Sequence, residues 1–188
     1  MELSVLILAA GKGTRMKSIL PKVMQPLAGK PLLAHVLATA KQLQSQRTIV
    51  VYGHGGELVQ QHFSDESIGW ALQAEQKGTG HAVQVALSQL PETGKTLILY
   101  GDVPLTTTTT LEKLLALVTD DNSLGLLSVN LDNPTGYGRI VREAGLVQRI
   151  VEQKDASEQE KLIAEVNTGI LCVPNKHLHT WLPTLKNT

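Results

Sequence analysis

The most informative segment of this chain is LSVLILAA, residues Leu3–Ala10. Nearly all of its side chains are apolar, which is typical of a strand buried on both faces of a parallel sheet. Gly11-Lys12-Gly13 follows it directly. A glycine-rich turn after the first strand of an α/β sheet commonly binds phosphate through its backbone N–H groups. The stretch therefore predicts an α/β fold with a candidate site at the end of its first strand.

Short apolar segments alternate with helical patterns in the part of the chain that follows. This alternation indicates an α/β sheet with right-handed crossovers. The run Thr106–Thr110 is expected to form a loop and the N-cap of a helix. The expected strands are Thr48–Tyr52, Ile68–Gln73, Thr96–Tyr100 and Leu124–Leu131, and the expected helices are Pro31–Gln46, Glu57–Phe63, Gly80–Leu90 and Leu111–Val118.

The pattern changes after Leu131. Arg139–Arg142 and Leu146–Glu152 flank Ala144-Gly145, and this arrangement predicts a β-hairpin inserted into the α/β pattern. The elements expected beyond it are a polar helix around Ser157–Ala164, a strand over Ile170–Val173 and a helix over Asn175–Leu185 that is broken near Pro183.

Composition and charge exclude several classes of protein. The 188 residues include 17 Lys and Arg against 17 Asp and Glu, and 42% are hydrophobic, which excludes a mainly disordered chain. With 2 Trp, 3 Tyr and 1 Phe and no excess of positive charge, the chain lacks the stacking platform or basic patch of a nucleic-acid-binding protein. No apolar run approaches the roughly 18 residues of a membrane span. Because residues 1–3 do not open a signal peptide and the single cysteine, Cys172, cannot form an internal disulfide, we expect a cytoplasmic location.

The glycine turn matches neither of the two common phosphate-binding signatures. A dinucleotide fingerprint would need glycine where Met16 stands, and a P-loop would need glycine at Leu6. Two cations, Arg15 and Lys22, nevertheless follow the turn. Arginine offers a planar fork to phosphate oxygens, and lysine offers a compact charge that can follow a moving phosphoryl group. From these residues alone, a phosphate site and a structural turn with solvated cations both stay open.

A carboxylate stands at a second strand end. Asp102 follows the apolar run Leu97–Gly101. A carboxylate beside a phosphate-binding turn is suited to hold Mg²⁺, which takes carboxylate, phosphate and water oxygens. The alternative is an aspartate that caps a turn. The sequence shows no pair of nucleophile and base, and no histidine cluster with metal-binding spacing.

Several motifs, in this order, resemble one family over almost the whole chain. Leu8–Met16 with Leu20–Lys22 resembles the opening motif of the sugar-1-phosphate nucleotidyltransferases. The later motifs are similar to those of the N-terminal uridylyltransferase domain in the bacterial bifunctional N-acetylglucosamine-1-phosphate uridylyltransferase/glucosamine-1-phosphate acetyltransferases. They are Tyr52–Gly56, Gln73–Gln76, Gly78–Ala82, Tyr100–Leu105, Pro134–Ile140, Ile150–Glu152 and Glu165–Gly169.

The resemblance implies a Rossmann-like, predominantly parallel sheet of the nucleotide-diphospho-sugar transferase type. It also implies a Mg²⁺-dependent reaction in which N-acetylglucosamine-1-phosphate attacks the α-phosphorus of UTP in line. Pyrophosphate leaves, and UDP-N-acetylglucosamine forms for the precursors of peptidoglycan and lipopolysaccharide. Such a step depends on positioning and on neutralised charge more than on acid–base chemistry. The implied partners are the two substrates, with no nucleic acid and no membrane.

The resemblance also implies roles for single residues. Arg15 would neutralise the departing pyrophosphate, Lys22 the phosphates at the reacting centre, and Asp102 would hold the metal; these are the implied catalytic residues. Gln73, whose amide can offer a donor and an acceptor together, would select the base with the Gly78-Thr79 turn. The implied substrate-binding residues are Leu8, Ala9, Ala10, Gly11, Gly13, Lys22, Gln73, Gln76, Gly78, Thr79, Tyr100, Gly101, Asp102, Gly138, Glu152 and Asn167, of which Tyr100, Gly138, Glu152 and Asn167 would bind the sugar.

The chain departs from the family beyond these motifs. In the family, the uridylyltransferase domain continues and is followed by a β-helix of hexapeptide repeats, which carries acetyl transfer and forms a homotrimer; no such repeat occurs here. We therefore expect residues 1–188 to be a C-terminally incomplete uridylyltransferase domain, with weakened turnover and a second metal ligand beyond the chain. Two alternatives stay open: a non-catalytic module that binds nucleotide or sugar phosphate, and another sugar-1-phosphate nucleotidyltransferase.

Overall fold

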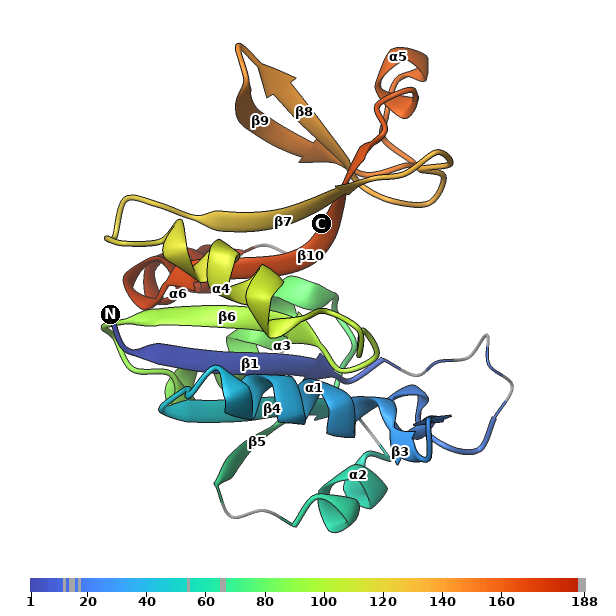
Figure 1. The fold of residues 1–188 in the computed structure, drawn as a ribbon, viewed down its shortest axis with the longest axis vertical. Coiled ribbons are helices and arrows are strands. Elements are labelled where there is room, and N and C mark those ends of the chain that lie inside the picture. Colours follow the sequence, from blue (N-terminus) through green and yellow to red (C-terminus); the bar gives the residue numbers. More distant parts are fainter. Residues whose placement is uncertain (12, 14–15, 17, 54, 65–66, 186–188) are drawn as a thin grey trace. The chain divides into compact units, whose positions relative to one another are not determined.

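The chain folds into two compact units, residues 1–125 with 171–188 and residues 126–170 (Figure 1). The computed structural model describes every residue except 12, 14–15, 17, 54, 65–66 and 186–188. The described helices are α1 (Leu32–Gln42), α2 (Glu57–His62), α3 (Thr79–Ala86), α4 (Thr108–Ala116), α5 (Glu158–Lys161) and α6 (Asn175–Trp181), with 3-10 turns η2 (Lys22–Met24), η3 (Leu87–Gln89) and η4 (Leu182–Thr184). The described strands are β1 (Leu3–Ala9), β2 (Pro26–Leu27), β3 (Lys30–Pro31), β4 (Arg47–Gly53), β5 (Ile68–Gln73), β6 (Lys95–Tyr100), β7 (Gly125–Asn130), β8 (Arg139–Glu143), β9 (Leu146–Val151) and β10 (Glu165–Pro174).

The first unit is built on a mostly parallel sheet in the order β5-β4-β1-β6-β10. β1 pairs in parallel with β4 and with β6, and β4 pairs in parallel with β5. β10 runs antiparallel to β6 from Leu171 to Pro174. All seven residues of β1 are buried, as its apolar sequence predicts for a strand covered on both faces. The predicted α/β class and the predominantly parallel sheet are confirmed.

Helices cover both faces of this sheet. A buried apolar cluster joins Leu6 of β1 and Ile49 of β4 to Ala82 of α3 and Leu178 of α6. α1 and α4 lie on the opposite face (Figure 1). Because successive side chains of a strand point to opposite faces, each central strand contributes to both layers, and the sheet forms a rigid base for the residues at its ends.

The strand order leaves an opening at the C-terminal end of β1. The chain passes from β1 to β4 on one side and, after β5, returns to β6 on the other side of β1. In open α/β sheets such a reversal creates a crevice outside the carboxyl ends of the two central strands. Gly11 and Asp102 lie just beyond β1 and β6, so the topology brings the predicted phosphate turn and the predicted metal ligand to this crevice.

The second unit contains the predicted hairpin. β8 and β9 pair antiparallel, with a bulge between Val141 and Arg142. The turn residues Ala144 and Gly145 have φ angles of 47° and 81°, the left-handed values that a two-residue hairpin turn requires. The first part of β10 pairs with β7 and, through Val166 opposite Arg139, with β8. The hairpin insertion is confirmed.

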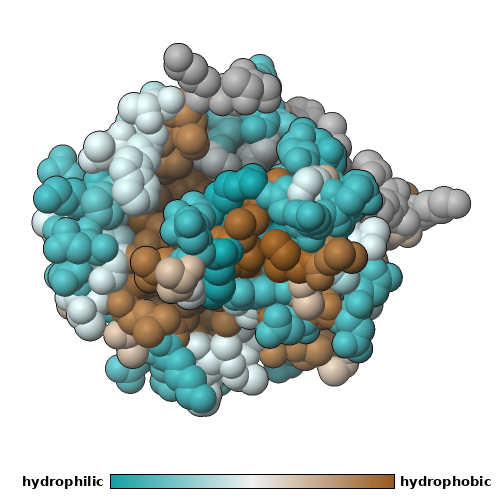
Figure 2. Space-filling view, turned by 90° about the horizontal axis from the view of Figure 1, so that it is seen from above, coloured by the Kyte–Doolittle hydropathy of each residue, from teal (hydrophilic) through white to brown (hydrophobic). Residues whose placement is uncertain are grey.

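The hairpin presents a mixed surface. Leu146, Val147 and Ile150 of β9 are exposed. Figure 2 shows that apolar side chains are interspersed with hydrophilic ones on the face it presents. None of the helices in the described part of the chain is long and apolar enough to cross a membrane.

Some predicted boundaries are wrong. β10 begins at Glu165 rather than at Ile170, because its polar first half pairs with neighbouring strands and its backbone groups are satisfied there. α1 ends at Gln42 rather than at Gln46, and Gln44 has a left-handed φ of 53° that ends the helix. The helix predicted around 157–164 covers only Glu158–Lys161. The short pair β2–β3 was not predicted.

Candidate active site

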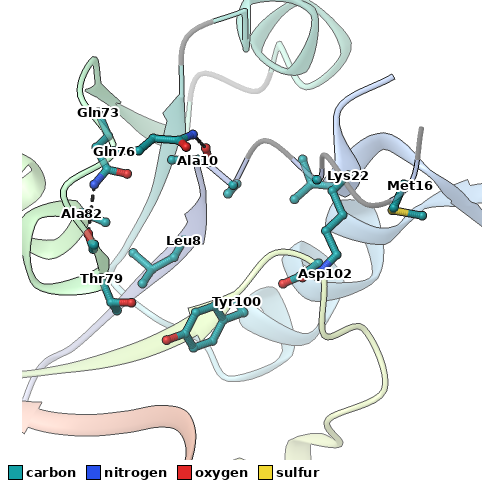
Figure 3. Close-up of a pocket in the computed structure, with 15 residues that line it drawn as sticks. Leu8, Ala10, Met16, Lys22, Gln73, Gln76, Thr79, Ala82, Tyr100 and Asp102 are labelled. Carbon is teal, nitrogen blue, oxygen red and sulfur yellow. Dashed lines mark hydrogen bonds and ion pairs between the residues drawn. The ribbon is translucent and has the colours of Figure 1, made fainter. Parts of the chain in front are cut away.

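A pocket of about 540 Å³ opens at the C-terminal ends of β1, β5 and β6. This volume lies within the range of roughly 300–1,000 Å³ that small-molecule sites occupy. Figure 3 shows Lys22 and Asp102 on one side of the pocket and the two glutamines on the other, with Tyr100 between them. The lining residues are Leu8, Ala9, Ala10, Gly11, Gly13, Met16, Lys22, Val23, Gln73, Gln76, Gly78, Thr79, Ala82, Tyr100 and Asp102.

Gly13 brings the glycine turn close to Lys22. Its φ angle is +57°, and a Cβ atom at this position would lie 2.7 Å from the Cβ atom of Lys22. A side chain there would strain the backbone and displace Lys22. The glycine is therefore required for the turn to pack against the lysine.

The amino group of Lys22 forms an ion pair with the carboxylate of Asp102. Lys22 begins η2, directly after Pro21, and Asp102 lies in the turn after β6. The side chain of Lys22 is 42% exposed and that of Asp102 is 21% exposed, so both remain open to a ligand in the pocket. The pair places a cation suited to phosphate oxygens beside a hard oxygen ligand suited to a metal ion.

The donor chemistry at Asp102 fits Mg²⁺ bound together with a phosphorylated substrate. Among the described residues, no group of three or more His, Cys, Asp or Glu could hold a metal ion by itself. Mg²⁺ in nucleotide sites commonly takes one or two carboxylates and fills its other positions with substrate phosphates and water. A single carboxylate on the pocket wall is sufficient for that mode of binding.

The side-chain amides of Gln73 and Gln76 lie on the opposite wall of the pocket. The side chain of Gln73 is 3% exposed, and its Nε2 donates to the carbonyl of Gly78 over 3.0 Å and lies 3.2 Å from Nδ1 of His81. Gln76 donates from Nε2 to the carbonyl of Ala10 at the end of β1. The amide nitrogen of Gln73 is thus already engaged, and its Oε1 is the group left for a ligand. The sequence predicts both a donor and an acceptor function for Gln73, and the structure leaves the acceptor for a ligand.

Three residues to which the resemblance assigns sugar binding lie together in the second unit. The backbone N–H of Asn167 donates to the carbonyl of Gly138 over 2.8 Å. A Cβ atom at Gly138 would lie 3.1 Å from Oε1 of Glu152, so glycine permits this close approach. Oδ1 of Asn167 accepts from the N–H of Gly169 over 2.8 Å. Asn167 and Glu152 therefore offer an amide donor and a carboxylate acceptor beside Gly138.

Arg139 holds the loop that precedes this cluster. Its side chain is 1% exposed. The guanidinium donates to the carbonyl of Tyr137, to Oε1 of Gln153 over 2.7 Å and to the carbonyl of Lys161 over 3.4 Å. Its buried Nε has no hydrogen-bond partner among the residues that the structure describes. A buried charge is costly to leave unpaired, and these hydrogen bonds connect three segments of the second unit, at Tyr137, Gln153 and Lys161.

The pocket does not contain every residue that the sequence singled out. Arg15 lies outside the described residues. Gly101 does not line the pocket; its N–H donates to the carbonyl of Leu8 over 2.9 Å, which joins β6 to β1 beneath the site. Met16, Val23 and Ala82 line the pocket and were not predicted, because apolar lining residues carry no chemical signature. The helical spacing of Ala82, one turn after Thr79, could have indicated it.

The surroundings of two further titratable groups shift their pKa values. Cys172 of β10 is fully buried, and burial raises the pKa of its thiol to about 11. The thiol is therefore neutral at physiological pH. Beside the pocket, a hydrogen bond and the charge of Lys77 lower the pKa of Glu75.

Comparisons with known proteins agree with this geometry. Bifunctional protein GlmU of Acinetobacter baylyi is 59% identical over 187 residues, which are 100% of this chain and 41% of that protein. Bifunctional protein GlmU of Thiobacillus denitrificans is 60% identical over 186 residues, 99% of this chain and 40% of that protein. The chain therefore spans about two fifths of the length of the curated relatives it matches.

A solved structure and a family model complete the comparison. A UDP-glucose pyrophosphorylase solved with UDP-glucose has a TM-score of 0.81 and 18% identity, with coverage of 99% of this chain and 81% of that chain, and it shares the fold. Residues 5–167 match the family model of the MobA-like NTP transferase domain. These residues include the glycine turn, Lys22, Gln73 and Asp102. The chain belongs to the family of MobA-like NTP transferase domains.

Proposed function

We propose that this chain transfers the uridylyl group of UTP to N-acetylglucosamine-1-phosphate and releases pyrophosphate. One observation carries the proposal: a single pocket brings together the glycine turn, the Lys22–Asp102 pair and the anchored amide of Gln73. These groups suit the parts of a nucleoside triphosphate, since phosphates need cations and a base needs hydrogen-bonding partners. The high identity to the bifunctional GlmU proteins supports this reaction over that of other nucleotidyltransferases.

In the proposed step, an oxygen of the sugar phosphate forms a bond to the α-phosphorus of UTP. The bond from that phosphorus to the β-phosphate oxygen breaks, and pyrophosphate carries the negative charge away. The attacking oxygen is already an anion, so no base has to remove a proton. The contribution of the protein is to orient both phosphates and to neutralise their charge.

Two cations and one carboxylate serve this step. Lys22, which lines the pocket, neutralises the phosphates at the reacting centre. We assign Arg15, outside the described residues, to the leaving pyrophosphate, where a guanidinium can bind two oxygens at once. Asp102 would hold Mg²⁺, which when bound neutralises phosphate charge as a Lewis acid. Lys22 and Asp102 lie on the same side of the pocket (Figure 3), so both act on the phosphate end of the nucleotide.

Substrate recognition is assigned to the remaining site residues. Gln73 and the Gly78-Thr79 turn bind the base. The resemblance assigns sugar binding to Tyr100 of the first unit and, separately, to Gly138, Glu152 and Asn167 of the second unit. We also propose a cytoplasmic location, based on the balanced charge and the single cysteine. Acetyl transfer and trimer formation are not proposed for residues 1–188, which contain no hexapeptide repeat.

The proposal is tested by an assay of pyrophosphate release with all pairs of UTP, dTTP, CTP or GTP and N-acetylglucosamine-1-phosphate or glucose-1-phosphate. We expect the highest rate with UTP and N-acetylglucosamine-1-phosphate, and loss of that rate when EDTA removes Mg²⁺. Calorimetry of the same pairs measures binding separately. Binding without turnover in every pair would indicate a non-catalytic module. A higher rate with glucose-1-phosphate would indicate another sugar-1-phosphate nucleotidyltransferase.

A further inference from the structure

The amide of Gln73 is held in one orientation by two acceptors. Its nitrogen lies 3.0 Å from the carbonyl oxygen of Gly78 and 3.2 Å from Nδ1 of His81. A backbone carbonyl can only accept a hydrogen bond, so the amide atom that faces Gly78 must be Nε2 and not Oε1. Figure 3 shows the nitrogen of Gln73 turned away from the pocket and its oxygen on the pocket side.

Both acceptors come from the first turn of α3. The carbonyl of Gly78 also accepts from the N–H of Ala82 over 3.1 Å, the first hydrogen bond of the helix. His81 lies on the same turn and is not among the residues that line the pocket. A primary amide nitrogen carries two hydrogens. Gly78 takes one and Nδ1 of His81, in the tautomer that carries its proton on Nε2, takes the other.

Gln73 therefore meets a ligand as an acceptor and not as a donor. The hydrogen bonds that the structure describes for the Gln73 amide both use Nε2, and neither uses Oε1. Uracil and thymine carry a hydrogen on N3, whereas N3 of cytosine is itself an acceptor. An acceptor placed opposite N3 attracts uracil and thymine and repels cytosine. A buried site that must leave this acceptor unpaired when cytosine binds discriminates strongly against cytosine.

We propose that His81 is a positioning residue that sets the base selectivity of the pocket. By accepting the second hydrogen of Gln73 Nε2, it removes the donor that would otherwise be available to cytosine. His81 acts through Gln73 and does not touch the nucleotide. This inference rests on the proposed function, because it assumes that Gln73 faces the base.

The test compares substitutions at position 81 by calorimetry with UTP, CTP and N-acetylglucosamine-1-phosphate. His81→Leu removes the acceptor and puts an apolar side chain of roughly similar size in its place. His81→Asn retains an acceptor, since Oδ1 of asparagine is bonded to Cγ as Nδ1 of histidine is. The matched control is Gln84→Leu, an exposed position on the same helix.

We expect His81→Leu to lower the preference for UTP over CTP by about threefold to tenfold, the effect of one hydrogen bond. His81→Asn and Gln84→Leu should keep the wild-type preference, and the affinity for N-acetylglucosamine-1-phosphate should stay unchanged in all three. Equal loss of UTP and CTP affinity in His81→Leu would mean a purely structural role and would overturn the proposal. So would an unchanged preference.

A second measurement needs no variant. Nitrogen-15 NMR of the Gln73 side-chain amide in the wild-type protein should show both of its protons protected from solvent exchange. One freely exchanging proton would overturn the role of His81. If the wild-type protein prefers UTP and only the His81 results fail, the proposed function stands without this inference. If the wild-type protein shows no preference for UTP, both fail together.

Discussion

In the first unit the fully buried side chains are mainly aliphatic, among them Leu6, Ile49 and Leu97, whereas in the second unit the largest is that of Arg139. The apolar layers of the first unit supply its stability through burial. Its polar pocket residues at the strand ends can therefore stay partly exposed and meet a ligand. The second unit relies on hydrogen bonds to hold its loops, so its polar side chains serve structure and recognition together. Replacing a polar site residue of the first unit should therefore mainly lower turnover. Replacing a buried polar residue of the second unit should mainly lower stability.

The largest effect should be on turnover, in the first unit. Asp102→Asn removes the carboxylate of the pocket, and Arg15→Ala removes the proposed partner of the leaving pyrophosphate. Each is expected to lower turnover at least 10²-fold, or about 2.7 kcal/mol of transition-state stabilisation. For Asp102→Asn the free energy of unfolding should change by less than about 1 kcal/mol, because the Lys22–Asp102 pair is partly exposed and solvent screens it.

Pyrophosphate release and urea denaturation check this pair of results. Asp121→Asn, at an exposed aspartate of the same unit, is the matched control and should leave both measurements unchanged. A large loss of stability in Asp102→Asn would contradict this difference between the units, since it would mean that the stability of the first unit also depends on its polar pocket.

The next effect should be on stability, in the second unit. Arg139→Met removes the hydrogen bonds to Tyr137, Gln153 and Lys161 and is expected to lower stability by about 2 kcal/mol. Hydrogen exchange of the amides in residues 126–170 should speed up by about 30-fold, the equivalent of that energy. Amides of β1 and β4 should keep their rates.

Lys154→Met, at an exposed position of the same unit, is the control for this variant. Its exchange rates should match those of the wild-type protein. A more stable Arg139→Met variant would contradict the expectation and would show that desolvation of the guanidinium outweighs its hydrogen bonds.

A third, smaller effect concerns a polar contact that stabilises a helix in the first unit. The hydroxyl of Thr107 caps α4 by accepting from the N–H of Thr110 over 3.3 Å. Thr107→Ala should cost about 1 kcal/mol. Thr109→Ala, at an exposed position inside the helix, should instead stabilise by a few tenths of a kcal/mol, because alanine has the higher helix propensity. Thermal melting of both variants measures the difference. Equal melting points would show that the hydroxyl of Thr107 does not stabilise the helix as a cap.

The smallest effect should depend on pH. Hydrogen bonds from Arg142 and then Ser128 hold the pKa of Glu165 at about 2, below its ordinary value of 4.5. Because the folded pKa is the lower one, Glu165 contributes stability above about pH 4.5 and loses it as the pH falls toward about 2. Glu165→Gln should therefore cost no more than about 1 kcal/mol at neutral pH, since solvent screens the pair. Urea denaturation should show this difference vanish near the lower pKa; a constant difference would contradict the linkage.

The sequence predicted the parts of the fold that depend on local patterns. The apolar run 3–10 predicted a strand buried on both faces, and Ala144-Gly145 predicted a tight hairpin, because each pattern has one physical solution. The start of β10 was missed because Glu165 and Asn167 are polar residues that only their neighbouring strands can accommodate. The turn between β2 and β3 was missed because its strands are two residues long.

The candidate site divides in the same way. Gly13, Lys22 and Asp102 could be singled out because they follow strands whose carboxyl ends meet at one edge of the sheet. The orientation of the Gln73 amide could not, because it depends on His81 and on the carbonyl of Gly78, which only the start of α3 brings together. The roles assigned to these residues stay predictions, as does that of Arg15, which lies outside the described part of the chain.

The buried thiol of Cys172 can report local openings of the fold. With its pKa raised to about 11 and its side chain fully buried, it cannot react with a thiol reagent in the closed structure. Each labelling event must therefore record an opening of the fold that exposes this thiol. Since the chain has one cysteine, the labelling rate in the presence of a nucleotide would report how strongly that nucleotide suppresses such openings, with no substitution and no added probe.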